Sequence, residues 1–85
     1  MKITKEHYKY MKTRVNSYIK TNKVNVKQKL KEYEQHNLSR KRFNWDLLIA
    51  SQLYTYIVDV LYKEGYTDKH IDTAINKIVD SYLNV

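Results

Sequence analysis

Apolar residues recur every three or four positions over most of this 85-residue chain, which is the spacing of amphipathic helices. The first stripe predicts a helix over about residues 5–20, with Thr4 as its N-cap. A second, shorter helix is expected over about 26–36, where Asn25 is in position to cap it. The cleanest stripe predicts a last helix over about 68–83. Each of these helices would bury one side and expose the other.

The segment between the second and last of these helices is apolar on more than one side. Ser39 is a natural N-cap there, and Gly65 a natural end, because glycine adopts the left-handed backbone conformation without steric cost. These signals predict one long third helix over about 40–64. Because several of its sides are apolar, we expect this helix to be central, with the others packed around it.

The residues that strands and hairpins need are nearly absent, since the chain has one Gly and no Pro. We therefore predict an all-α fold, a compact four-helix domain with a long central third helix, in which residues 1–85 form a single helical domain. A domain of this size has a small stability margin, so a homodimer is one possibility. Its contact would be the extra apolar side of the third helix, around Trp45 and Tyr56.

Composition excludes several classes of protein. The chain has no Cys, so it has neither a disulfide framework nor a thiolate metal site. The opening MKITKEHYKYMK has no apolar segment typical of a signal peptide, and the longest aliphatic run, Leu47 to Ala50, is far too short to cross a bilayer. We expect a cytoplasmic protein that has no membrane partner.

Positive charge is concentrated in the first half of the chain. Residues 1–42 contain 13 Lys or Arg and 3 Asp or Glu, whereas residues 43–85 contain 3 and 6, which gives the net charge of +7. The lysines on the polar sides of the first two predicted helices form a candidate partner-binding set: Lys5, Lys9, Lys12, Lys20, Lys27 and Lys31. Such a surface would attract nucleic acid or an acidic protein, or would only keep the helices solvated. Lys outnumbers Arg 13 to 3, and base reading depends on Arg, so sequence-specific recognition is not expected.

The third predicted helix begins with three consecutive cations, Arg40, Lys41 and Arg42, which join the candidate partner-binding residues. Cations are mildly unfavourable at a helix N-terminus, and that cost points to an external contact. The alternative is that they keep the first turn soluble while Trp45 enters the core. In either case Asp46 is spaced to pair with Arg42 one turn earlier.

Tyrosine is unusually frequent, with nine residues in the chain. Tyr is enriched at interfaces because it buries a large rigid ring while its hydroxyl stays available for a partner. Most of the tyrosines fall in the apolar stripes, but Tyr10 and Tyr56 lie off them. These two complete the candidate partner-binding set.

Catalysis and metal binding find little support. The DKHID stretch brings Asp68, His70 and Asp72 within one turn, but residues two apart point to different sides of a helix. Aspartates near a helix N-terminus are also favoured by the macrodipole alone. No Gly-rich phosphate loop or nucleophile elbow is found. We predict a protein that is not an enzyme and that needs no cofactor or metal.

A resemblance to known sequences covers about residues 42–79. The matching positions are Arg42, residues 45–48, Leu61, Tyr62, residues 70–75, Ile78 and Val79. They resemble a pattern in small uncharacterised helical proteins carried by phages and prophages, and the lysine-rich start shares only an ITKEHY-like opening. The resemblance implies a mobile-element accessory protein. Small non-enzymatic phage proteins of this size block host machinery, including CRISPR defence complexes, by occupying a surface.

Two hypotheses for the function follow. The first is inhibition of a bacterial host defence complex, such as an anti-CRISPR activity, in which the lysine-rich side binds a host protein or ribonucleoprotein. The alternative is direct, non-specific binding of nucleic acid. Both require that folding gathers the early lysines on one exposed side of the molecule.

Overall fold

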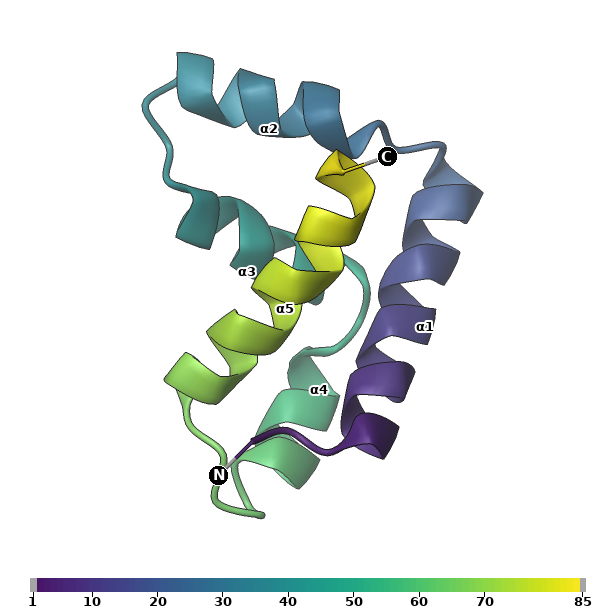
Figure 1. The fold of residues 1–85 in the computed structure, drawn as a ribbon, viewed down its shortest axis with the longest axis vertical. Coiled ribbons are helices and arrows are strands. Elements are labelled where there is room, and N and C mark those ends of the chain that lie inside the picture. Colours follow the sequence, from purple (N-terminus) through teal and green to yellow (C-terminus); the bar gives the residue numbers. More distant parts are fainter. Residues whose placement is uncertain (1, 85) are drawn as a thin grey trace.

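The computed structural model describes residues 2–84, and within them every regular element is helical (Figure 1). The elements run in the order α1 Lys5–Asn22, α2 Val26–Gln35, α3 Arg40–Ala50, α4 Tyr54–Tyr56, the π-helical segment η1 Ile57–Leu61, and α5 Asp68–Leu83. The all-α prediction is confirmed for this part of the chain. The Cα radius of gyration, 12.6 Å, is near the value of about 12 Å expected for a compact domain of this length.

Side-chain caps define where the first three helices begin. The side chains of Thr4, Asn25 and Ser39 each accept a hydrogen bond from the backbone N–H three residues later, at 3.1, 3.1 and 3.0 Å respectively. A cap of this kind depends only on a side-chain oxygen placed directly before the helix, so it is visible in the sequence. The predicted starts of α1, α2 and α3 are therefore confirmed.

The long helix predicted over 40–64 does not form, because the chain turns after Ala50. Gln52 has a φ of 61°, in the left-handed region that an α-helix does not use. The chain then passes through the short α4 into η1, where the N–H of Tyr62 donates to the carbonyl of Ile57 at 2.9 Å. This bond spans five residues, which is the π-helical pattern.

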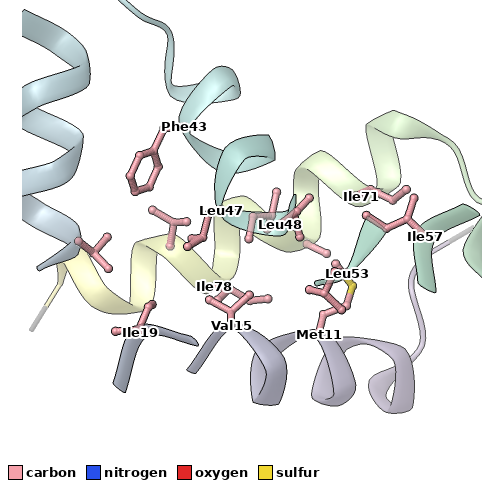
Figure 2. Close-up of a cluster of buried hydrophobic side chains, with 14 of the residues drawn as sticks. Met11, Val15, Ile19, Phe43, Leu47, Leu48, Leu53, Ile57, Ile71 and Ile78 are labelled. Atoms are coloured by element: carbon pink, nitrogen blue, oxygen red, sulfur yellow. The ribbon is translucent and has the colours of Figure 1, made fainter. Parts of the chain in front are cut away.

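The break allows both apolar sides of this segment to reach one core. Leu48 before the break and Leu53 after it are each 0% exposed, and Ile57 is buried in the same cluster (Figure 2). A straight helix would carry some of these side chains to its outer surface. Gly65, with a φ of 95°, follows η1 as the predicted end of this part of the chain. The segment predicted as one central helix is thus α3 followed by a separate α4–η1 unit.

The centre of the core is formed by α5 in place of the predicted third helix. α5 crosses the middle of the molecule, with α1, α2 and α4 around it (Figure 1). Its residues Ile71, Ile75 and Ile78 are 0% exposed. α2 and α3 pack against α5, whereas α1 packs against α3. Met11 and Val15 of α1 join the same buried cluster (Figure 2).

Candidate functional site

The three cations at the start of α3 are engaged within the molecule. Each one forms an ion pair with an aspartate: Arg40 with Asp80 at 2.5 Å, Lys41 with Asp72 at 3.9 Å, and Arg42 with Asp46 at 3.5 Å. The Arg42–Asp46 pair is the one predicted from the spacing along the helix. The other two pairs join α3 to α5, so this basic turn has a role inside the fold.

A seam of polar contacts continues along the α3–α5 border. The indole N–H of Trp45 donates to Asp72 at 2.5 Å, and the side-chain amide of Asn44 donates to Asn76 at 2.5 Å. Asp72, Asn76 and Asp80 recur every four residues, which places them on one edge of α5. The carboxylates of Asp72 and Asp80 are therefore drawn toward α3. The opposite edge of α5 has neither of them.

The lysines of α1 lie on the side of that helix that borders α5. Lys5, Lys9, Lys12 and Lys20 fall within about a quarter of the helix circumference. Asn16, on the same side, accepts a hydrogen bond from the hydroxyl of Tyr82 in α5. Among the described residues, none of the four ammonium groups has an ion-pair or hydrogen-bond partner. Lys12 is partly buried and the other three are exposed.

An open groove of about 500 Å³ lies between the start of α1, the segment before it, and α5. It is lined by four lysines, Lys2, Lys5, Lys69 and Lys77, and by Ile3, Tyr8, His70, Thr73 and Ala74. None of these lining residues is Asp or Glu. The ammonium group of Lys77 lies 5.2 Å from the centre of the Tyr8 ring, which is a cation–π distance. The groove therefore combines four positive charges with an apolar floor.

The sequence does not reveal that Lys69 and Lys77 join the N-terminal lysines. The second half of the chain is acidic on average, which hides these two cations in the overall balance. In the sequence the two are eight residues apart, about 80° around the helix, and Lys69 falls between Asn76 and Asp80, so only the folded structure assigns both lysines to the groove. We name the combined set the lysine face, and it consists of Lys5, Lys9, Lys12, Lys20, Lys69 and Lys77.

The other edge of α1 packs on the α4–η1 unit. The hydroxyl of Tyr56 bonds to Nδ1 of His7, whose Nε2 lies 2.8 Å from Glu64. The rings of Tyr10 and Tyr56 are 4.4 Å apart. Burial, and to a lesser extent the charge of Glu64, raises the pKa of Tyr56 above its ordinary value. Tyr56 is thus used inside the fold, whereas Tyr10 is 44% exposed.

The apolar patch predicted as a homodimer contact, around Trp45 and Tyr56, is divided in the structure because the predicted third helix is broken between these two residues. Trp45 bonds to α5, and Tyr56 bonds to α1. Each ring is partly buried and takes part in a different helix contact. The exposed apolar side chains of this region are instead Ile49 and Tyr54, at 56% and 59%.

The two remaining candidate lysines belong to α2. Lys27 and Lys31 are exposed and lie one turn apart on the same side of that helix. Lys27 borders a shallow hollow with Lys23 and with Tyr82 of α5. Lys29, on the other side, pairs with Glu32 at 3.4 Å. The structure does not bring Lys31 into the groove.

The DKHID stretch has a structural role at the start of α5. Nδ1 of His70 accepts a hydrogen bond from the backbone N–H of Thr67 at 3.0 Å, which is one half of a capping box. Asp68 accepts a hydrogen bond from the hydroxyl of Tyr62. No group of three or more His, Asp or Glu side chains within residues 2–84 is placed to hold a metal ion. None of the helices in that range has the length and hydrophobicity that crossing a lipid bilayer requires.

No protein-family model matches the chain, and no curated protein or solved structure matches it significantly. The resemblance to phage-encoded proteins therefore stays a prediction that rests on the sequence pattern.

Proposed function

We propose that this protein is a non-enzymatic accessory protein of a phage or other mobile element, which inhibits a bacterial host defence complex such as a CRISPR effector. It would do so by placing its lysine face against an acidic surface of that complex. The observation that supports this proposal is the sorting of charge around α5. The carboxylates of Asp72 and Asp80 pair with α3, and none of the residues that line the groove between α1 and α5 is Asp or Glu.

An acidic protein fits this surface better than nucleic acid does. Arginine is the side chain that clamps phosphate through two parallel hydrogen bonds. All three arginines already have partners within the molecule, since Arg14 bonds to Gln52, Arg40 to Asp80 and Arg42 to Asp46. The lysine face itself contains no arginine. Lysine ammonium groups act as point charges that pair equally well with scattered carboxylates.

A charge-reversal experiment tests the proposal. In the variant Lys9→Glu/Lys20→Glu, two exposed positions of the lysine face become acidic, and neither position lines the groove. We expect this variant to lose capture of its host partner and to lose inhibition of CRISPR interference in cells. The control Lys29→Glu/Lys63→Glu has the same change in net charge on other surfaces and should retain both. Circular dichroism would verify that the two variants have the same helicity.

Nuclease treatment of the host lysate separates the proposal from its alternative. Capture that survives nuclease and is lost only in the Lys9→Glu/Lys20→Glu variant supports an acidic protein surface. Capture that disappears after nuclease, with affinity for random nucleic acid that falls steeply with added salt, would establish non-specific nucleic-acid binding in its place. Equal activity of the two variants would show that the lysine face does not bind the partner.

A further inference from the structure

The groove between α1 and α5 brings together positive charges from distant parts of the chain. Lys2 and Lys5 come from its start, whereas Lys69 and Lys77 come from α5. Like charges around one groove repel one another, and no lining carboxylate offsets that repulsion. The aspartates Asp72 and Asp80 of α5 do not offset it, because they pair with Lys41 and Arg40 of α3 and do not line the groove. A negatively charged occupant would relieve this repulsion.

The floor of the groove is apolar. Ile3 and Tyr8 are partly buried against the core, and Ala74 is 5% exposed. Filling this floor with a hydrophobic group removes apolar area from water on both partners, which is favourable. The occupant that fits is therefore negatively charged at its edges and apolar at its centre.

We propose that this groove binds a short acidic segment of the partner protein, with one aliphatic side chain inserted between Ile3, Tyr8 and Ala74. Carboxylates on either side of that side chain pair with Lys5, Lys69 and the other lining lysines. This inference rests on the proposed function, because the acidic segment belongs to the partner protein that the lysine face is proposed to bind. The volume of about 500 Å³ suits a few side chains of one extended segment.

The same features argue against a nucleotide strand in the groove. Proteins that bind single-stranded nucleic acid stack its bases on exposed aromatic rings. Tyr8 is the only ring of that kind among the lining residues apart from the His70 imidazole, and Lys77 already covers one of its faces. The imidazole of His70 is held by the Thr67 cap. The aliphatic groups of Ile3 and Ala74 contribute nothing to base stacking.

Two labelled peptides test this inference directly with the full-length protein. The first probe has one leucine between runs of glutamate, and the second has serine in place of that leucine. Fluorescence anisotropy should show that the leucine probe binds about tenfold more tightly, because burial of one leucine side chain is worth at least that factor. A single-stranded DNA oligonucleotide of mixed sequence serves as a third probe.

Two variants identify the groove as the site. Thr73→Trp places a large side chain in the groove without a change of charge, and it should reduce binding of the leucine probe to the level of the serine probe. Lys69→Glu should weaken binding of both peptides about tenfold, whereas the control Lys63→Glu, outside the groove, should leave the preference for leucine intact. Circular dichroism melting would show that each variant is folded.

Several outcomes would overturn the inference. Equal affinity for the leucine and serine probes would show that the apolar floor is not used. Unchanged binding in both Thr73→Trp and Lys69→Glu would place the peptide elsewhere, and preferential binding of DNA that Thr73→Trp blocks would assign the groove to nucleic acid. The proposed function is tested separately, because Lys9→Glu/Lys20→Glu leaves every lining residue unchanged.

Discussion

The hydroxyl of Tyr62 donates a hydrogen bond to Asp68 at the start of α5. This bond, together with burial and the negative charge of Asp68, raises the pKa of Tyr62 from 10.0 to about 12. The phenol can donate only while it is protonated, so the folded state holds the proton more tightly than the unfolded chain does. The stability of the junction between η1 and α5 therefore depends on pH in the alkaline range through this one side chain.

The sign of this coupling gives a prediction. Because the pKa is raised in the folded state, the stabilisation is complete below pH 10.0 and is lost as the pH rises toward about 12. Tyr62→Phe should lower the free energy of unfolding at neutral pH by about 1 kcal/mol and should reduce its decline over this alkaline range. Urea denaturation at a series of pH values would measure both effects.

Tyr54→Phe is the matched control for that experiment. The hydroxyl of Tyr54 has no hydrogen-bond partner among the described residues, and the side chain is 59% exposed. We expect its pH profile to follow that of the unmodified protein, in which Tyr33, Tyr56 and Tyr82 also have raised pKa values. Identical alkaline profiles for Tyr62→Phe and the unmodified protein would contradict the assignment to Tyr62.

At the scale of helices, the α3–α5 seam sets how these two elements meet. Asn44 is 2% exposed, and its amide N–H group donates to Asn76 at 2.5 Å. On either side of this bond, Arg40 pairs with Asp80 and the indole of Trp45 bonds to α5. A shift of one helical turn between the helices would break all of these contacts together. The seam therefore selects one register for two otherwise apolar surfaces.

A pair of variants tests the central bond of the seam. Asn76→Ala leaves the buried amide of Asn44 without its acceptor, so we expect a loss of about 1 to 2 kcal/mol in the free energy of unfolding. Adding Asn44→Leu removes the buried polar group and should restore most of that loss. Chemical denaturation of the single and double variants would measure the difference. A double variant that is less stable than Asn76→Ala would show that the loss of stability does not come from the unpaired amide of Asn44.

The helix starts were predictable from the sequence, and the break after α3 was not. Thr4, Asn25 and Ser39 act on the backbone three residues away, so their signal is local. Gln52 carries no such signal, because the left-handed conformation is typical of Gly or Asn and Gln adopts it here only as part of the tertiary structure. Apolar residues on several sides of the segment predicted that it is buried, but Ile49 and Tyr54 are exposed, and the pattern did not distinguish one central helix from two shorter elements.

The candidate site was predictable in part for a similar reason. The lysines of α1 share a side of that helix because of their spacing, which is a property of the sequence. The partners of Arg40 and Lys41 lie about 30 to 40 residues later, so only the tertiary fold brings them together. The same holds for Lys69 and Lys77, which reach the groove because α5 lies beside the start of α1.

At the scale of the whole molecule, α5 divides the surface charge. Its residues Asp72 and Asp80 pair with α3, whereas Lys69 and Lys77 line the groove that α5 forms with the start of α1. The net charge of +7 is therefore unevenly exposed. A surface of this kind speeds encounter with an acidic partner and orients it before close contact is made. We therefore expect a partner to bind at the α1–α5 border and not at the basic turn that begins α3.

Lysine acetylation of the protein, alone and bound to the partner captured from nuclease-treated host lysate, tests this central claim most directly. Mass spectrometry would report the reactivity of each lysine in the two states. The account predicts that Lys5, Lys9 and Lys69 become protected in the complex, while Lys29 and Lys63 react as before. Protection of Lys29 and Lys63 with no change at the α1–α5 border would contradict it.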